Sequence, residues 1–514
     1  MDNNLISRAL ISVSDKNGLI EFAKFLQSFD IEIISTGGTA EYLRGSGLEI
    51  KEVSQVTNFP EMLDGRVKTL HPLIHGGLLG KRNNITHQEE MLSNGIERID
   101  MLVVNLYPFE EAVHSGASKE ECIENIDIGG PAMIRSAAKN FNDVVVVTSP
   151  SDYLSVIKEM KSEKGSVSRP MKRKLASKAF SLTAYYDSKI SLWFNNNDEN
   201  YFPDLLSLSA TKSKNLRYGE NPHQIGAFYE QANQDLDWTQ YQGKDLSYNN
   251  YMDLQSAFDI VDEFSDPSCA IIKHSNPCGF ATGSNLVEAY NRSVSCDPIS
   301  YFGGIVSFNK EVCKDLAEKL IEPFLECIIA PSFSKDALNI LKKKKNLRVI
   351  ALHSNYKKNK FEIRSTSGGF LIQESDSFKY DDFSNFQIVT DLKPDENVMK
   401  SLKLGWVVVR FVKSNAIVIA NKNQILGVGA GQMSRVDSVR IAIRKIKEFG
   451  LSTEGAVMAS DAFFPFPDCL ELASEIGVKS VIQPGGSRND DEVIKAANNL
   501  GMSMVLTSVR HFYH

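Results

Sequence analysis

The segment Ile31-Glu-Ile-Ile-Ser-Thr-Gly-Gly-Thr39 joins a short β-branched run to a glycine turn, and helical spacing of apolar residues follows. This order predicts a strand over 31–35 and a helix that opens at the glycines. The preceding residues repeat the order, because the apolar run Arg8–Ser12 is followed by helical spacing from Leu19 to Phe29. Two successive strand–helix units indicate an α/β domain with a mostly parallel sheet.

Similar apolar runs continue along the chain. Strands are predicted over 100–106, 144–147, 269–273, 305–308, 327–330, 349–352, 416–420, 456–460, 480–483 and 504–507, with long helices over 171–194, 434–449 and 490–500. The stretch Asn195–Ser213 is rich in Asn, Asp, Ser and Pro, which favour turns. We therefore expect one domain over 1–197, with its α/β core over 1–150, and a larger α/β domain over 198–514. The larger domain is expected to have two subdomains that part near Lys342–Lys345 and the polar stretch after His353.

Composition excludes several classes of protein. The 514 residues include 57 Lys and Arg against 64 Asp and Glu, and the net charge of -7 disfavours a general nucleic-acid binder. No run approaches the roughly 18 apolar residues that a membrane span needs, and no signal sequence precedes the first strand, so we expect a cytoplasmic protein. The seven cysteines include no C-x-x-C pair, which supports neither a disulfide framework nor a cysteine-built zinc site.

The turn Ser35-Thr-Gly-Gly-Thr39 is a candidate anion site, because backbone N–H groups and the helix dipole would face a bound phosphate. Ser12, Ser14 and Lys16 end the neighbouring strand and would add hydroxyls and a cation to the same rim. The alternative is an ordinary glycine turn capped by Thr39.

Three further segments of the first domain could supply proton transfer and charge stabilisation. The loop Gly65-Arg-Val-Lys-Thr-Leu-His-Pro72 carries two cations and a hydroxyl, although a solvated basic loop would have the same composition. Asn105-Leu-Tyr-Pro108 follows a buried strand, and Asp127-Ile-Gly-Gly130 precedes a helix that carries Lys139. Spacing alone does not show that Lys68, Tyr107, Asp127 and Lys139 converge, and structural pairing is the alternative.

In the second domain, Lys273-His274 closes a predicted strand and enters a Ser-Asn-Pro turn, which would leave the imidazole at a sheet edge. Histidine titrates near neutrality, so His274 is a candidate general base, and a surface histidine that caps a turn is the alternative. Two other motifs are rejected. Gly427-Val-Gly-Ala-Gly431 lacks the G-x-G-x-x-G order of a dinucleotide site, and Asn276-Pro-Cys-Gly279 lacks the partners of a deaminase zinc site.

Taken together, the motifs resemble the bifunctional purine-biosynthesis enzymes that combine AICAR (5-aminoimidazole-4-carboxamide ribonucleotide) transformylase and IMP cyclohydrolase. The likeness spans practically the whole chain. Its marks are Ser12-Val-Ser-Asp-Lys16, Ser35-Thr-Gly-Gly-Thr39, Phe59-Pro-Glu-Met-Leu-Asp-Gly-Arg-Val-Lys-Thr-Leu-His-Pro72, Asn105-Leu-Tyr-Pro-Phe109, Ile126-Asp-Ile-Gly-Gly-Pro131, Ala137-Ala-Lys-Asn140, Leu216-Arg-Tyr-Gly-Glu-Asn-Pro-His-Gln224, Lys273-His-Ser-Asn-Pro-Cys-Gly279, Lys413-Ser-Asn415, Gly429-Ala-Gly-Gln-Met-Ser-Arg435, Ser460-Asp-Ala-Phe-Phe-Pro-Phe466, Gln483-Pro-Gly-Gly-Ser487 and Arg510-His-Phe-Tyr-His514.

The resemblance implies a methylglyoxal-synthase-like first domain that closes the purine ring of formyl-AICAR to give IMP. Lys139 with Asp127 would manage proton transfer at the amide, and Lys68, Tyr107 and Thr69 would hold and protonate the formyl oxygen. The substrate would also be bound by Ser12, Ser14, Lys16, Ser35, Thr36, Gly37, Gly38, Thr39, Arg66 and Asn105.

The resemblance also implies a second domain of two cytidine-deaminase-like subdomains without zinc, which would use 10-formyltetrahydrofolate as formyl donor. His274 would take a proton from the AICAR amine, and Lys273 would stabilise the oxyanion or protonate the leaving nitrogen. AICAR would contact Arg217, Tyr218, Gly303, Glu326, Asn415 and Arg435, and the folate would contact Phe463, Ser487 and Arg510.

Family members are homodimers and act on small molecules, so we expect a homodimer with no nucleic-acid or membrane partner. Members can also hold a structural potassium ion, but no metal site is assigned from this sequence. The rival hypotheses are a phosphate-eliminating enzyme and a nucleotide-sensing protein built on the same folds.

Overall fold

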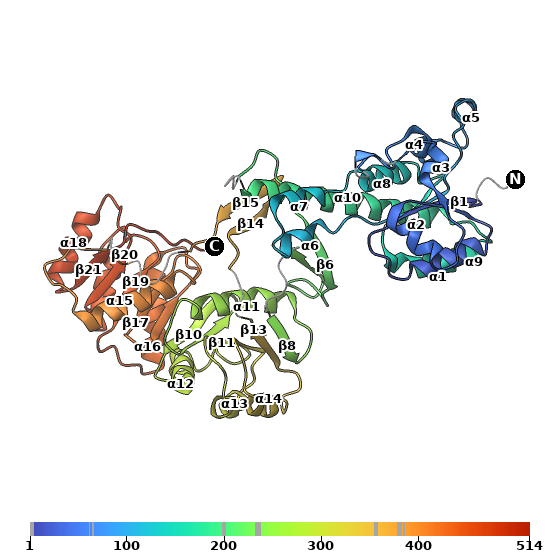
Figure 1. Cartoon of the computed structure of the whole chain (residues 1–514). Coiled ribbons are helices and arrows are strands. Elements are labelled where there is room, and N and C mark those ends of the chain that lie inside the picture. The colour runs from blue at the N-terminus through green and yellow to red at the C-terminus, as the bar shows by residue number, and fades with distance from the viewer. Residues whose placement is uncertain are drawn as a thin grey trace. The chain divides into compact units, whose positions relative to one another are not determined.

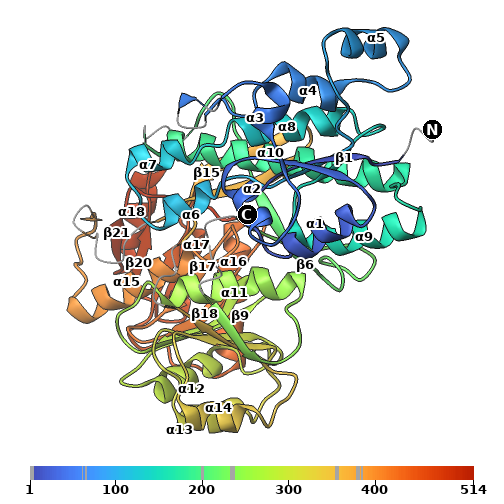
Figure 2. The ribbon, with the colours of Figure 1, turned by 45° about the vertical axis from the view of Figure 1, so that its right-hand side comes forward.

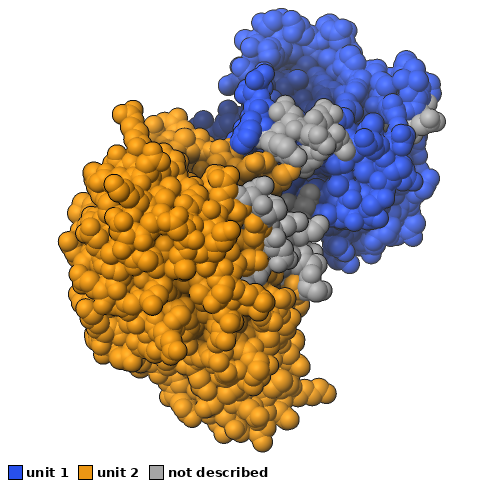
Figure 3. Space-filling view, turned by 90° about the vertical axis from the view of Figure 1, so that its left-hand side faces the viewer, with its two compact units in different colours: residues 1–211, 231–233 blue, residues 212–230, 234–514 orange. Residues whose placement is uncertain are grey.

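The protein is described as a computed structural model that covers residues 5–60, 62–63, 66–197, 202–231, 238–353, 358–377, 383 and 386–514. Gly65 of the basic loop, residues 198–201 at the expected domain boundary and residues 354–357 after His353 lie outside the described residues. Two compact units are present, Met1–Thr211 with Gln231–Asn233 and Lys212–Glu230 with Gln234–His514 (Figure 3). Within the described part of the chain, no helix combines the length and apolarity that crossing a membrane requires.

Unit 1 is built on a five-stranded sheet of order β3-β2-β1-β4-β5 whose strand pairs are all parallel, which confirms the predicted parallel sheet. The strands are β1 (Arg8–Ser12), β2 (Glu32–Ser35), β3 (Lys51–Glu52), β4 (Met101–Val104) and β5 (Val145–Val147). The helices are α1 (Leu19–Gln27), α2 (Gly37–Arg44), α3 (Val53–Thr57), α4 (Pro72–Leu79), α5 (Ile85–Ser93), α6 (Phe109–His114), α7 (Lys119–Glu124), α8 (Gly129–Lys139), η2 (Pro150–Asp152), α9 (Tyr153–Ser162) and α10 (Arg169–Asn197).

Helices cover the sheet of unit 1 because strands such as β4 and the edge strand β5 are apolar on both faces. All four residues of β4 are buried, as are all three of β5. Helices α1 and α9 pack together on one side of the unit, and α4 and α8 pack together on the other (Figure 1). The carboxyl ends of β1, β2 and β4 therefore meet at one edge of the sheet, where ligands gather in parallel α/β folds.

Unit 2 contains two six-stranded sheets, of order β10-β9-β11-β12-β13-β8 and β16-β21-β20-β19-β17-β18. The first consists of β8 (Trp238–Gln242), β9 (Ser268–Lys273), β10 (Asn276–Thr282), β11 (Ile305–Phe308), β12 (Cys327–Ala330) and β13 (Arg348–Leu352), and the second of β16 (Gln387–Ile388), β17 (Ile417–Ala420), β18 (Ile425–Gly429), β19 (Val457–Ser460), β20 (Ser480–Gln483) and β21 (Ser503–Leu506). Two small two-stranded sheets pair β6 (Ala210–Asn215) with β7 (Ala227–Gln231) and β14 (Phe361–Thr366) with β15 (Gly369–Glu374).

The sheets of unit 2 separate its apolar cores, since neighbouring residues of β9 such as Ile271 and Ile272 belong to different cores, and helices cover the sheet faces. The helices are α11 (Tyr248–Val261), α12 (Leu286–Cys296), α13 (Lys314–Leu320), α14 (Lys335–Leu341), α15 (Glu396–Val409), α16 (Arg435–Glu448), α17 (Asp468–Glu475) and α18 (Asp490–Asn499). Helices α12, α13 and α14 lie together at one end of the unit (Figure 2). A single core around the fully buried Trp406 includes Ile272 of the first sheet and Val418 of the second, so α11, α15 and both sheets pack together.

One local prediction in unit 2 is wrong. The sequence suggests a Ser-Asn-Pro turn after His274, but Asn276 and Pro277 already belong to β10, and only His274 and Ser275 separate the two antiparallel strands. Proline is tolerated here because β10 is an edge strand whose register shifts between Pro277 and Gly279.

Candidate functional site

The glycine turn of unit 1 lies where β2 ends and α2 begins. Thr36 is the N-cap residue of α2 and has extended backbone geometry, and Gly37 has a φ of 47°. A Cβ at Gly37 would lie 2.5 Å from Nζ of Lys68, whereas a Cβ at Gly38 would meet open space. The absence of a side chain at Gly37 thus lets the Lys68 ammonium approach the helix N-terminus, where backbone N–H groups also favour an anion.

The hydroxyls that flank this turn hold it against β1. Ser35 is buried, and its Oγ donates to the carbonyl of Ile11 at 2.7 Å. Thr39 is also buried, and its Oγ1 donates to the carbonyl of Val13 at 3.0 Å and accepts the Val13 N–H at 3.2 Å. Ser35 and Thr39 therefore fix the shape of the turn, and their hydroxyl groups already have partners within the protein.

Asn105 fixes the loop that follows β1. Its Oδ1 accepts the N–H groups of Ser14 at 2.6 Å and Asp15 at 3.0 Å, and its Nδ2 donates to the carbonyl of Asp15 at 2.9 Å. The structure thus brings Asn105 and Ser14 together, as the sheet topology predicts, and Ser12 ends β1 beside them. Lys16 lies in the same loop, with its Nζ 6.0 Å from the centre of the Tyr42 ring.

A cluster of polar groups around Asp127 lies at the N-terminus of α8. Oδ1 of Asp127 accepts the N–H of Gly130 at 2.8 Å, and the Asp127 N–H donates to Oη of Tyr186 at 2.9 Å. Burial raises the pKa of Asp127, while hydrogen bonds from the backbone of Gly130 and Tyr107 act in the opposite direction. Oγ1 of Thr69 is close by, 2.7 Å from where a Cβ at Gly129 would lie.

The two clusters of unit 1 are joined by the chain itself, because Lys68 at the glycine turn and Thr69 at α8 are consecutive. Two other predicted residues have no hydrogen bond or ion pair with either cluster in the part of the chain that the structure describes. Lys139 is the last residue of α8, about 15 Å along the helix from its first turn. Arg66 is exposed and pairs with Glu124. Helix geometry thus separates the backbone of Lys139 from the N-terminus of α8, and the joint role of Lys139 and Asp127 in proton transfer stays a prediction.

In unit 2, Lys273 lies at the end of β9 and borders a cavity. Its Nζ donates to the carbonyl of Phe302 at 2.7 Å and lies 3.4 Å from the Cβ position of Gly303. The cavity has a volume of about 210 Å³, and its lining includes Lys273, Cys278 and the Asp297–Lys445 ion pair, whose charged atoms are 2.9 Å apart. His274, the next residue, is exposed.

The structure places Glu326 behind the Gly303 loop. Its N–H donates to the carbonyl of Gly304 at 3.1 Å, and its carboxylate pairs with the buried Arg348 at 2.7 Å. Lys273, Gly303 and Glu326 therefore belong to one region of the first sheet.

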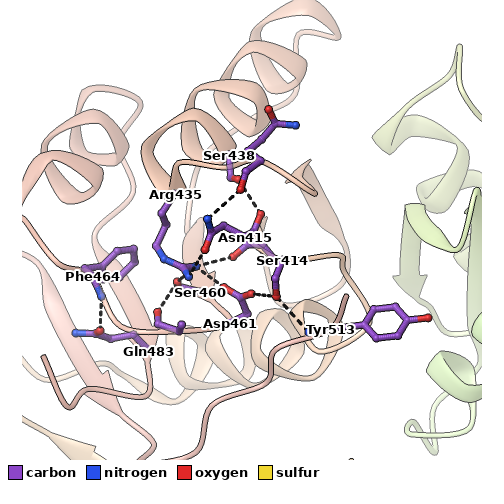
Figure 4. Close-up of polar contacts among 12 residues, drawn as sticks. Ser414, Asn415, Arg435, Ser438, Ser460, Asp461, Phe464, Gln483 and Tyr513 are labelled. Carbon is purple, nitrogen blue, oxygen red and sulfur yellow. Dashed lines mark hydrogen bonds and ion pairs between the residues drawn. The ribbon is translucent and has the colours of Figure 1, made fainter. Parts of the chain in front are cut away.

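Arg435 and Asn415 form a buried network at the second sheet (Figure 4). The guanidinium group of Arg435 pairs with the fully buried Asp461, and it donates to Oγ of Ser460 and to Oδ1 of Asn415, both at 2.8 Å. Oδ2 of Asp461 also accepts the hydroxyl of Ser414 at 2.5 Å. The charge of Arg435 is thus neutralised inside the protein, and we expect it to position Asn415.

The remaining predicted residues make contacts that are local in sequence. Arg217 is exposed, with its guanidinium 5.7 Å from the centre of the Tyr218 ring. Phe463 is 39% exposed, and Oγ of Ser487 accepts the N–H of Asn489 at 3.1 Å. Arg510 is exposed above the Phe512 ring at 4.4 Å. No group of three or more potential metal ligands gathers among the residues that the structure describes.

Two carboxylates were missed by the sequence reasoning. Asp253 accepts hydrogen bonds at the His274 turn, and burial raises its pKa while the charges of His274 and Lys273 lower it. The sequence feature that could have identified Asp253 is its place among apolar residues. It lies next to Leu254 and four residues before Ala257, so a helix would put this acidic residue on its buried face. Asp461 lies in a quoted motif, but only the fold shows that it pairs with Arg435.

Two family models match this chain. The family model described as AICARFT/IMPCHase bienzyme matches residues 137–445, and a model described as MGS-like domain matches residues 18–132. This chain belongs to the AICARFT/IMPCHase bienzyme family. The predicted family and the methylglyoxal-synthase-like first domain are thereby confirmed.

Relatives of the bienzyme family match this chain over nearly its full length. Three proteins named bifunctional purine biosynthesis protein PurH are 48%, 49% and 50% identical to it, from Bradyrhizobium diazoefficiens, Persephonella marina and Bacillus cereus respectively. In each case 99% of this chain and 99% of the relative are covered.

Proposed function

We propose that this chain is a bifunctional enzyme of purine biosynthesis that converts AICAR to IMP in two steps. The first step transfers a formyl group to the 5-amino group of AICAR, and the second closes the ring of formyl-AICAR with loss of water. The observation that carries this proposal is the full-length similarity to the PurH proteins at 48–50% identity. The rival hypotheses of a phosphate-eliminating enzyme and a nucleotide sensor have no observation in their favour.

We assign ring closure to residues 1–197 and formyl transfer to residues 198–514. The two six-stranded sheets of unit 2 would be the two cytidine-deaminase-like subdomains. The formyl donor would be 10-formyltetrahydrofolate, and the active form would be a homodimer in the cytoplasm, as the family resemblance implies.

For ring closure, the N-terminus of α2 binds the phosphate together with Lys16, because backbone N–H groups and an ammonium both favour an anion. The carboxamide nitrogen attacks the formyl carbon, and Asp127 takes up its proton. The raised pKa of Asp127 suits it to this step. Lys68 and the hydroxyls of Thr69 and Tyr107 stabilise and protonate the formyl oxygen. The formamide nitrogen gives up its proton as it forms a double bond to the formyl carbon, and the oxygen leaves as water. Lys139 stays a predicted catalytic residue without an assigned step.

For formyl transfer, His274 accepts a proton from the AICAR amine as its nitrogen attacks the formyl carbon of the folate. Lys273 stabilises the resulting oxyanion beside Gly303, and the carbon–nitrogen bond to the folate then breaks as the leaving nitrogen takes up the proton that His274 accepted. Arg217, Tyr218 and Asn415 would hold AICAR, and Phe463, Ser487 and Arg510 would hold the folate. We assign Arg435 and Glu326 to the support of this site, because both pair with protein groups.

A coupled assay tests the proposal. The full-length chain is incubated with AICAR and 10-formyltetrahydrofolate, and IMP and tetrahydrofolate are quantified. We expect equal amounts of both products, no IMP when the folate is omitted, and IMP without folate when formyl-AICAR is supplied. A folded chain that produces no IMP from either substrate would contradict the proposed function.

A further inference from the structure

The turn that carries His274 has an unfavourable backbone. His274 and Ser275 have φ values of 52° and 59°, and both lie in the left-handed region. Non-glycine residues in sparsely populated regions cost on the order of 1–3 kcal/mol each and persist only where neighbouring groups hold them. The exposed His274 side chain has little packing of its own, so contacts to the backbone of the turn must hold this conformation.

Asp253 of α11 supplies one of these contacts. Its Oδ1 accepts the N–H of Ser275 at 2.7 Å and the hydroxyl of Ser275 at 3.3 Å. Ser275 is only 7% exposed, so water cannot readily replace the carboxylate as acceptor. A buried N–H without a partner costs about 1–3 kcal/mol, which is as large as the backbone cost of one left-handed residue.

Asn276 holds the same turn from the other side. Its Nδ2 donates to the carbonyl of His274 at 3.0 Å, and its Oδ1 accepts the N–H of Lys413 at 2.9 Å. The carbonyl of His274 and the N–H of Ser275 are therefore both held. Loss of the Asp253 acceptor would leave the turn attached on one side only.

We propose that Asp253 is a positioning residue for formyl transfer: it accepts the Ser275 N–H and so holds the backbone that presents the imidazole of His274. This inference rests on the proposed function and on the role of His274 as base. A misplacement of about 1 Å can lower a rate by about 100-fold, so a small movement of the turn is enough to matter.

Two substitutions separate the position of the acceptor from its charge. Asp253→Asn removes the charge and keeps an oxygen at the same place. Asp253→Glu keeps the charge and moves the oxygens by one methylene. A positioning role predicts that the Asn variant retains formyl transfer and the Glu variant loses it, whereas an electrostatic role predicts the reverse order.

The experiment measures kcat and KM for AICAR with the full-length chain and 10-formyltetrahydrofolate. We expect Asp253→Glu and Asp253→Ala to lower kcat by about 10- to 100-fold, with KM changed by less than about twofold. Asp253→Asn should stay within about threefold of the unmodified chain, because the amide oxygen accepts the same hydrogen bonds. Circular dichroism and the Tm of unit 2, compared with those of the unmodified chain, report that each variant is folded, because ring closure in unit 1 would not reveal a misfolded unit 2.

Asp262→Asn and Asp262→Ala are the matched controls, since Asp262 caps the other end of α11 and pairs with Lys358. Both should leave kcat unchanged. Asp253→Glu with an unchanged kcat, or Asp253→Asn as inactive as Asp253→Glu, would overturn the inference and leave the proposed function intact. An unmodified chain that forms no formyl-AICAR would overturn the proposed function itself.

Discussion

Replacement of Asp461 tests whether the buried network at the second sheet stabilises unit 2. In Asp461→Ala the guanidinium of Arg435 loses its counter-charge, although it keeps Ser460 and Asn415 as acceptors. The side chains of Arg435 and Asp461 are 8% and 0% exposed, so water cannot solvate the charge that remains. Breaking a buried ion pair costs about 3–5 kcal/mol, and the remaining hydrogen bonds place this case near 3 kcal/mol.

Differential scanning calorimetry is the assay, with Asp437→Ala as the matched control. Asp437 pairs with Arg440 on the same helix at 2.8 Å, but their side chains are 49% and 61% exposed, and such a pair contributes at most about 1 kcal/mol. Unit 2 has about 300 residues, and an unfolding entropy of about 2.1 cal/mol/K per residue gives about 1.6 °C per kcal/mol, so we expect Asp461→Ala to lower the Tm of unit 2 by roughly 5 °C. A Tm within about 2 °C of the control would refute the reasoning.

Two further predictions concern unit 1. Burial raises the pKa of Asp127, so its contribution to stability is full below the ordinary carboxyl pKa and is lost as the pH rises through the raised value. The Tm of Asp127→Asn should therefore be higher than that of the unmodified chain at pH 7.5, and the two should be equal below about pH 4. The variant should also lose ring closure. A lower Tm than that of the unmodified chain at pH 7.5 would contradict this reasoning. Asn105→Ala removes three hydrogen bonds to an exposed loop and should cost about 1 kcal/mol in chemical denaturation. It should also raise KM for formyl-AICAR more than it lowers kcat, and an unchanged KM would show that the loop does not bind substrate.

The strands could be predicted from sequence because each is a short apolar run whose residues are buried together. Predicted strands over Arg8–Ser12, 305–308, 327–330 and 480–483 match β1, β11, β12 and β20. The strand β10 was not predicted because Pro277 suggests a turn, and only the sheet shows that it lies at an edge.

The site could be predicted by residue type more readily than by contact. Lys68 lies beside Gly37, a residue that precedes it by 31 positions in the chain. Local spacing cannot predict a contact between residues so far apart in sequence. The position of Lys139 relative to Asp127 follows from helix geometry, because a helix that begins at Gly129 carries residue 139 about 15 Å away. Hydroxyl and amide groups such as those of Ser35 and Asn105 are polar in sequence, yet the fold uses them for its own backbone.

The central claim is that two separate sites act in succession on one ribotide, and paired substitutions test it most directly. Both activities are measured on the full-length His274→Ala and Lys68→Ala variants, with formyl transfer followed from AICAR and ring closure from supplied formyl-AICAR. We predict that His274→Ala loses at least about 100-fold in formyl transfer and keeps ring closure, and that Lys68→Ala shows the opposite pattern. If each folded variant loses both activities to the same extent, the assignment of two independent sites is contradicted.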